Sequence, residues 1–356
     1  MNELLLDELD LKLLREICTG NGIGVNLTYL TKKLKRHRRT IRKKAEDLLQ
    51  QKIIDRPIFP FLELFREYPL LVAAYADLPT DERTQNWVKE DKNIFAAFRV
   101  RKGEYNTMLF EFHKSVLSYQ MWREKLVEEG KIPSREERVP SRPLYFSNHL
   151  IEKYRPHIGI ELIKSNFVKN KRKIEIDHFQ IDESSLDILT CLVNGEGIRV
   201  NENYLAKKLD IHRKTVIRRI MKMQKKNMIY KPLCRFPSFF APPGFLFIFS
   251  LVEVRKFKEK FMYDILNDSH VSLAYRISEG RHNLLLFEAH SSIEDYLQWE
   301  SNYEEKYHGC LGSIDNTFFS PKMALSIDQQ KVSLGIIEDK LKEIPKKATQ
   351  TNAFTS

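Results

Sequence analysis

The sequence repeats itself, and this constrains the fold more than any other feature. When the chain is shifted by 175 residues, so that Leu11 meets Leu186, two stretches align without a gap: LDLKLLREICTGNGIGVNLTYLTKKLKRHRRTIRKK and SSLDILTCLVNGEGIRVNENYLAKKLDIHRKTVIRR. After a two-residue insertion the match continues with Gly103 on Gly280, Asn106 on Asn283, His113 on His290, Tyr119 on Tyr296 and Trp122 on Trp299. A register that holds over such distances predicts two copies of one unit, each large enough for two small domains.

The first part of each unit is predicted to be helical. Leucine and isoleucine recur at helical spacing in 9–17 and 186–192, and a glycine-containing loop follows. A short helix (YLTKKL, YLAKKL), a three-residue turn and a longer helix starting near Arg38 or Arg213 complete the pattern. The segments that begin at Lys52 and Asn227 are typical of a short wing strand. Together these features predict a winged helix-turn-helix.

The second part of each unit alternates between strand and helix patterns. LLVAAYADL, DERTQNWVKEDKN, IFAAFRVRKG, EYNTMLFEFH, SVLSYQMWREKLVEE and REERVPSRPLYF follow the order βαββαβ, and the second copy repeats it. This order is typical of a ferredoxin-like fold. The predicted fold class is therefore α+β, with two tandem copies of a winged helix-turn-helix followed by a ferredoxin-like domain.

These patterns predict the boundaries of the domains. The last residues end in KKATQTNAFTS, whose polar composition is typical of disorder, after a short helix near 335–344. The predicted division is winged helix-turn-helix 1 at 1–58, ferredoxin-like domain 1 at 59–147, linker at 148–178, winged helix-turn-helix 2 at 179–235, ferredoxin-like domain 2 at 236–326 and a partly disordered tail at 327–356.

Composition narrows the class of partner and the compartment. A formal charge of +11 favours an acidic partner, but alone it cannot separate nucleic acid from membrane. The acidic start MNELLLDELD lacks the basic region of a secretory signal, and no apolar run is long enough to span a membrane. The four cysteines form no CxxC pair, which predicts reduced thiols in a cytoplasmic protein, with no metal site and no cofactor motif.

The segment KKLKRHRRTIRKK carries nine Lys or Arg in thirteen positions. On a helix, Ile41, Ala45 and Leu48 form the stripe that packs inward, so Arg39 and Lys43 point outward. Cations at a helix N-terminus oppose the macrodipole by about 0.3–1 kcal/mol each, so helix stability does not explain them, whereas DNA phosphates would. The predicted DNA-binding residues are Arg36, His37, Arg38, Arg39, Thr40, Arg42 and Lys43 in the first copy and His212, Arg213, Lys214, Thr215, Arg218 and Arg219 in the second.

These residues resemble the Lrp/AsnC family of transcription regulators. The opening Leu6-Asp7 with Asp10, the pairs Thr40-Ile41 and Thr215-Val216 in the second helix of each helix-turn-helix, and the turn Gly-x-x-Asn are similar to the family's motifs. The resemblance implies a cytoplasmic transcription regulator that binds double-stranded DNA and pairs through its sheet domains. Pairing within one chain and pairing as a homodimer both remain open.

The resemblance also implies a small-molecule effector site in the turn of the sheet domain. The candidate effector-binding residues are Gly103, Asn106, Gly280 and Asn283. The family has aspartate where this chain has Asn106 and Asn283, and an amide cannot form an ion pair with the ammonium of an amino acid. The effector is therefore unknown, and dimerisation alone is the other role for this domain.

Two other functions fit the same sequence. The siroheme decarboxylases combine the same architecture with sheet-domain His and Arg residues that act on a tetrapyrrole, and Arg281-His282 resembles that feature. Non-specific DNA compaction would use the same basic helices. His113 and His290 have no nucleophile or carboxylate partner that the sequence identifies, so no catalytic residue is assigned. A tetrapyrrole enzyme of this architecture does not need recognition helices loaded with cations, and this chain has two, so the chain is predicted not to be an enzyme.

Overall fold

The computed structural model describes residues 7–19, 23–58, 68–134, 141–147, 150–155, 157–176, 179–226, 228–229, 233–237, 240–277, 281–319, 323–328 and 330–344. Within these ranges no helix is long and apolar enough to cross a lipid bilayer. The predicted candidate Gly280 and the end of the chain after Ile344 lie outside the described residues.

Each copy contains a ferredoxin-like βαββαβ unit, so the chain has an α+β fold. In both units the first strand lies between the third and fourth strands, and every pairing is antiparallel. The first unit comprises β3 (Leu70–Ala76), α4 (Glu82–Glu90), β4 (Ile94–Lys102), β5 (Tyr105–His113), α5 (Val116–Glu128) and β6 (Arg142–Ser147). The second comprises β12 (Leu246–Val254), α10 (Glu259–Asn267), β13 (Val271–Arg276), β14 (Leu284–His290), α11 (Ile293–Lys306) and β15 (Leu311–Phe319).

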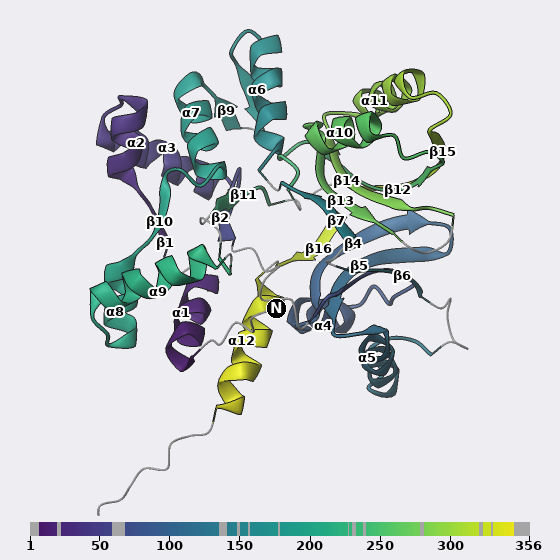
Figure 1. The fold of residues 1–356 in the computed structure, drawn as a ribbon, viewed down its shortest axis with the longest axis horizontal. Helices are drawn as coiled ribbons and strands as arrows, with labels where there is room; N and C mark the ends of the chain where they lie inside the picture. The colour runs from purple at the N-terminus through teal and green to yellow at the C-terminus, as the bar shows by residue number, and fades with distance from the viewer. Residues whose placement is uncertain are drawn as a thin grey trace, which may run out of the picture.

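The two sheets pack against each other within one chain (Figure 1). Their shared core is aromatic: the Phe98 and Phe319 ring centroids lie 4.6 Å apart, and the Phe110 and Phe287 centroids lie 5.5 Å apart. Such contacts add to the free energy gained by burying apolar surface. The intrachain pairing of the sheet domains is therefore present, and α4, α5, α10 and α11 lie on the outer faces.

Each sheet gains its fifth strand from the segment that follows the other unit. β7 (Ile151–Tyr154) pairs with β13, and β16 (Ala324–Ile327) pairs with β4. A helix follows each of these strands, α6 (Gly159–Lys169) after β7 and α12 (Lys331–Glu343) after β16. The segment 148–178 thus holds β7, α6 and β8 (Ile174–Ile176), and the helix predicted near the C-terminal end is present as α12.

The helical parts of the two copies exchange their first helices. Leu14 of α1 (Glu8–Cys18) is buried with Val216 and Ile220 of the second copy, whereas Leu189 of α7 (Glu183–Val193) is buried with Ile41 of the first. We call the group α7, α2 (Leu27–Leu34) and α3 (Arg38–Gln50) head 1, and the group α1, α8 (Glu202–Leu209) and α9 (Arg213–Lys225) head 2.

Short strand pairs connect the heads. β1 (Ile23–Val25) pairs with β10 (Ile198–Val200), and β2 (Asp55–Ile58) pairs with β11 (Leu233–Arg235), both antiparallel. β8 pairs with β9 (Phe179–Ile181) just before α7. The β1–β10 pair links the two heads at the left of Figure 1. Because each head contains helices from both copies, neither copy can form its head alone.

Candidate nucleic-acid interface and a side-chain cluster in the second copy

The basic helices α3 and α9 begin in the same way. Lys35 (φ 49°) and Asp210 (φ 49°) adopt the left-handed conformation that ends the preceding helix. The Nδ1 atoms of His37 and His212 then accept hydrogen bonds from the main-chain N–H groups two residues later, at 3.2 and 3.1 Å. Each histidine therefore caps a helix, the task usually performed by Ser, Thr, Asp or Asn.

The inward stripe of each basic helix is as predicted. Ile41, Ala45 and Leu48 are buried in head 1, and their counterparts Val216, Ile220 and Met223 are buried in head 2. Most of the other positions of the two helices are exposed to solvent. Exposed residues among the predicted DNA-binding set are Arg36, His37, Arg38, Arg39, Thr40, Arg42 and Lys43 in the first copy and His212, Arg213, Lys214 and Arg218 in the second; Thr215 is half-buried.

Arg219 lies differently from the rest of that set. It is half-buried, and its guanidinium donates at 2.6 Å to Asp7, which caps the exchanged helix α1, and at 2.9 Å to Asp10 within that helix. The equivalent Lys44 donates at 2.6 Å to Asp182, which caps the other exchanged helix, α7. These cross-copy ion pairs attach each first helix to its head, so we assign Arg219 to the fold and not to the interface.

The exposed cations of α3 lack acidic partners. The first turn of α3 contains no acid, and within the described part of the chain Arg38, Arg39 and Lys43 make no ion pair. In α9, Lys214 and Arg218 are similarly unpaired among the described residues, whereas Arg213 lies 3.7 Å from Glu202. Each head therefore presents solvated positive charge at the N-terminal end of one helix.

The candidate effector residues are occupied by contacts inside the sheet domains. Asn106 accepts from the main-chain N–H of Leu78 at 3.0 Å and donates to the Leu78 carbonyl at 2.8 Å. Asn283 makes the same pair of hydrogen bonds with Val254, both at 2.8 Å. Gly103 (φ +59°) forms the adjacent turn. Asn106 in β5 thus holds the loop that follows β3, and Asn283, which precedes β14, holds the end of β12.

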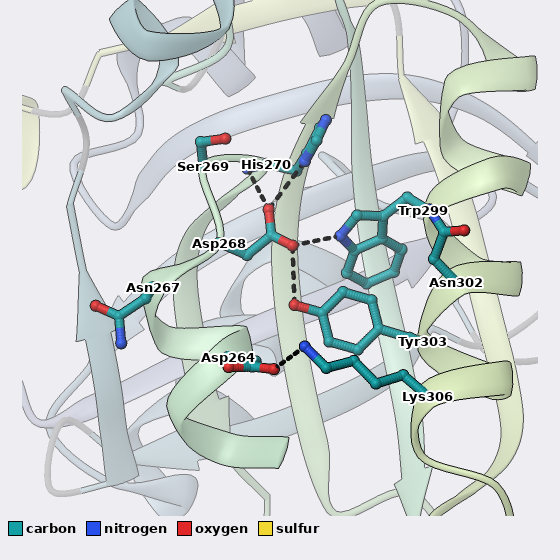
Figure 2. Close-up of a pocket in the computed structure, with 9 residues that line it drawn as sticks. All are labelled: Asp264, Asn267, Asp268, Ser269, His270, Trp299, Asn302, Tyr303 and Lys306. Carbon is teal, nitrogen blue, oxygen red and sulfur yellow. Dashed lines mark hydrogen bonds and ion pairs between the residues drawn. The ribbon is translucent and has the colours of Figure 1, made fainter. Parts of the chain in front are cut away.

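A pocket of about 520 Å³ opens on the outer face of the second sheet domain, and its centre is Asp268 (Figure 2). The carboxylate accepts from the Trp299 indole at 2.7 Å, from the Tyr303 hydroxyl at 2.9 Å and from His270 Nδ1 at 2.9 Å. Burial alone would raise the pKa of Asp268, but the hydrogen bonds from His270 and Trp299 hold it well below its usual value. Asp264 and Lys306 form an ion pair at the edge of the pocket.

In the first copy the equivalent carboxylate belongs to Asp91, and different residues surround it. Asp91 accepts from the Trp87 and Trp122 indoles at 3.2 and 3.0 Å. Asn93 stands where the second copy has His270, and its amide lies 3.1 Å from His113 Nδ1. Sequence reasoning missed Asp268 and His270, although the offset that aligned Trp122 with Trp299 also aligns Asp91 with Asp268.

Comparison with known proteins gives similarity at the level of fold. No family model matches the sequence, and no curated protein matches it. A crystal structure of the siroheme decarboxylase NirDL matches 94% of this chain and 100% of its own, with 12% identity and a TM-score of 0.50. The same enzyme in complex with an iron-uroporphyrin III analogue matches 95% and 98%, with 13% identity and a TM-score of 0.51. An AsnC-family transcriptional regulator from Agrobacterium tumefaciens covers 32% of this chain and 74% of its own, with 19% identity and a TM-score of 0.28.

The whole-chain matches contradict one prediction. From its two cation-rich helices the chain is predicted to be a DNA-binding protein and not an enzyme. The solved structures that match along the whole chain are those of an enzyme. Moreover, His113 and His290 do have carboxylate partners, Glu111 at 3.1 Å and Glu288 at 3.2 Å. Both partners precede their histidine by two residues, on the same face of a strand, which the alternation of a strand could have indicated.

Proposed function

We propose that this chain binds double-stranded DNA through the N-terminal ends of α3 and α9. The observation that carries the proposal is the set of exposed, unpaired cations at these ends, repeated in both copies. A helix that served only the fold would favour acids in its first turn, because the macrodipole is positive there. Phosphate groups would offset that cost by releasing counterions and by accepting charge-assisted hydrogen bonds.

The arrangement of each head supports the same proposal. A short helix, a left-handed residue and a capped second helix form a helix-turn-helix, in which the second helix is the one that enters the major groove. The apolar stripe of α3 is buried in its head, so the opposite face, with Arg39 and Lys43, is free to contact DNA. Pairing of β2 with β11 would form the wing-like element between the heads.

The N-terminal ends of the two basic helices, with the turns before them, differ in positive charge. Arg36 and Arg42 of the first copy correspond to Ile211 and Ile217 of the second, and Arg213 has an acidic neighbour. We therefore expect head 1 to contribute more to affinity, and the DNA site to be asymmetric. In this proposal one chain performs the task of a dimer, with the paired sheet domains fixing the spacing of the heads.

The biological role that we propose is transcription regulation of the Lrp/AsnC type. It rests on the sequence motifs that resemble this family. Because Asn106 and Asn283 use their amides within the fold, an amino-acid effector at these positions is not part of the proposal. The sheet domains act chiefly as the intrachain dimerisation element.

Fluorescence anisotropy with a labelled DNA duplex tests the proposal across a range of salt concentrations. Removing two phosphate contacts by R39A/K43A lowers the magnitude of the salt slope by roughly 2, and K214A/R218A has a smaller effect on affinity. The control variant K256A/K258A removes the same charge from exposed lysines before α10, so its binding should match that of the wild type. Equal affinity and slope for all four proteins would reject the interface. A comparison of random and selected duplexes separates regulation from non-specific compaction.

A second candidate function is chemistry on a tetrapyrrole, and the whole-chain similarity to a siroheme decarboxylase favours it. The side chains around the 520 Å³ pocket are less favourable, because Asp264 and Asp268 would repel the carboxylates of such a substrate. Arg281 is already paired with Glu253 at 2.8 Å. Titration with iron-uroporphyrin, followed by its Soret band, tests this function: a saturable shift at one equivalent supports it, and an unchanged spectrum excludes this ligand.

A further inference from the structure

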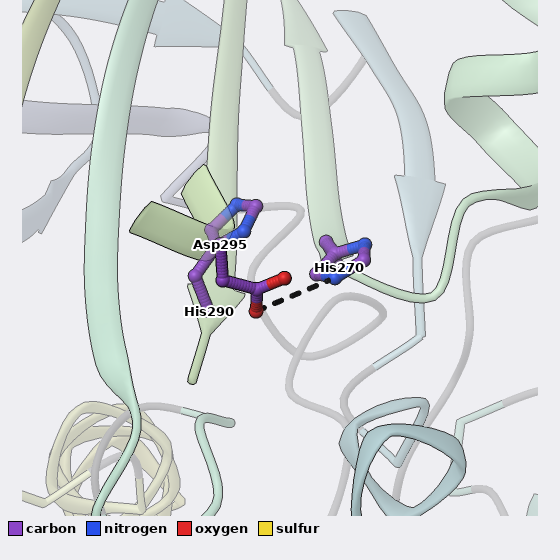
Figure 3. Close-up of side chains that lie close together, drawn as sticks. All are labelled: His270, His290 and Asp295. Atoms are coloured by element: carbon purple, nitrogen blue, oxygen red, sulfur yellow. Dashed lines mark ion pairs between the residues drawn. The ribbon is translucent and has the colours of Figure 1, made fainter. Parts of the chain in front are cut away.

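Two histidines and an aspartate gather at one end of the second sheet (Figure 3). His270 precedes β13, His290 ends β14 and Asp295 lies in the first turn of α11. One nitrogen of each ring and one oxygen of the carboxylate lie within 4.8 Å of one another. We call these three residues the His-His-Asp cluster.

His290 has an unused nitrogen in a buried position. Its side chain is 0% exposed, and its Nε2 lies 3.2 Å from Glu288 Oε2. Its Nδ1 has no hydrogen-bond partner among the described residues. A buried polar atom without a partner is unfavourable, so this nitrogen is available to a ligand that the protein chain itself does not provide.

The ring of His270 is oriented in a complementary way. Its Nδ1 donates to Asp268 Oδ1 at 2.9 Å, which leaves the lone pair on Nε2. That nitrogen lies 3.9 Å from Asp295 Oδ2, and the His270 and His290 rings stack with centroids 4.6 Å apart. Each histidine therefore has one nitrogen held by a carboxylate and another that makes no hydrogen bond among the described residues. This carboxylate–histidine pairing is the arrangement that orients histidines on metal ions.

Asp295 supplies the negative charge of the cluster. Its Oδ2 accepts from the main-chain N–H and the hydroxyl of Ser291, both at 2.8 Å, which fix its position. Its side chain is 35% exposed and that of His270 is 23% exposed, so an ion could enter from solvent. His270 also lines the 520 Å³ pocket, so a bound ion would be reached from that side.

We propose that the His-His-Asp cluster binds a divalent transition-metal ion, with zinc as the ion that its donors suit best. The ligands are His270 Nε2, His290 Nδ1 and the Asp295 carboxylate, and Asp268 and Glu288 hold the two rings from behind. Two imidazoles and one carboxylate leave one position of a tetrahedral zinc for water or another oxygen or nitrogen donor. Small rotations of the half-buried side chains of His270 and Asp295 bring the donors to the usual distance of about 2.0–2.1 Å.

The first copy lacks this site, which makes it an internal reference. His113 is retained, but Asn93 replaces His270 and occupies His113 Nδ1, and Ser118 replaces Asp295. H270N and D295S therefore introduce residues that the same fold accepts in the other copy. These variants should fold, and thermal unfolding by circular dichroism checks that they do.

The test is zinc binding by the full chain, measured by competition with a chromophoric chelator. Wild type should bind one equivalent, and H270N and D295S should each weaken that binding at least tenfold. D268N, which removes the support behind His270, should weaken it by about 10–100-fold. H308N removes an exposed histidine elsewhere in the chain and should leave binding unchanged.

Cobalt provides a second readout, which reports the ligands of the bound ion. Co²⁺ bound by two imidazoles and a carboxylate should give visible absorption bands, and these should be lost in H270N. Wild type that binds no equivalent of zinc, or folded H270N that binds zinc as tightly as wild type, would overturn the proposal. So would cobalt bands that persist in H270N, because the ion would then lie elsewhere.

Discussion

The two copies have the same fold but carry different side chains at the proposed functional sites. Copy one has the more basic helix N-terminus and preceding turn, with Arg36 and Arg42 where copy two has Ile211 and Ile217. Copy two has the His-His-Asp cluster, where copy one has Asn93, His113 and Ser118. The buried glutamate–histidine pair is present in both, at 3.1 and 3.2 Å. The same backbone fold therefore accepts different side chains at the end of the sheet and on the exposed face of the basic helix. The buried glutamate–histidine pair is the same in both copies.

The sharpest way to test this comparison is to transfer the cluster. N93H/S118D places the missing donors beside His113 in copy one, and we expect zinc stoichiometry to rise from one to two because the frame behind them is the same. Chelator competition measures the change. A stoichiometry that stays at one, in a variant that unfolds like wild type, would mean that these two positions do not account for the difference.

Substitutions that create a cavity in one head test the exchange of the first helices. Leu14 and Leu189 are fully buried, equivalent in sequence, and packed in opposite heads. Replacing either by Ala should lower the free energy of unfolding by about 2–5 kcal/mol. L14A should speed hydrogen exchange most in 213–225, and L189A most in 38–50. The reverse pattern would show that each first helix packs in the head of its own copy.

This exchange marks the limit of prediction from the sequence. The repeat and the periodicity indicated two copies, the βαββαβ order and the inward stripe of Ile41, Ala45 and Leu48. They could not indicate partners, because Leu14 and Leu189 occupy equivalent positions and either helix would fit either head. The cluster was missed for a related reason: His270, His290 and Asp295 lie in three different elements, and only the paired strands bring them together.

Smaller effects should follow from the cross-copy ion pairs. R219A removes the partner of Asp10, whose side chain is only 4% exposed, so we expect a loss of about 1–3 kcal/mol in unfolding free energy. K44A removes the partner of Asp182, which is 59% exposed and can return to water, so the loss should stay below about 1 kcal/mol. Urea denaturation of both variants gives the comparison. A larger loss for K44A would reject the assignment of Arg219 to the fold.

Footprinting of a selected DNA site tests most directly whether both heads bind one duplex. Wild type should protect two half-sites of unequal strength. R39A/K43A should remove protection from the stronger half-site and K214A/R218A from the weaker one, while the other half-site remains in each case. Absence of protection by wild type, or footprints of both variants identical to that of wild type, would contradict the account.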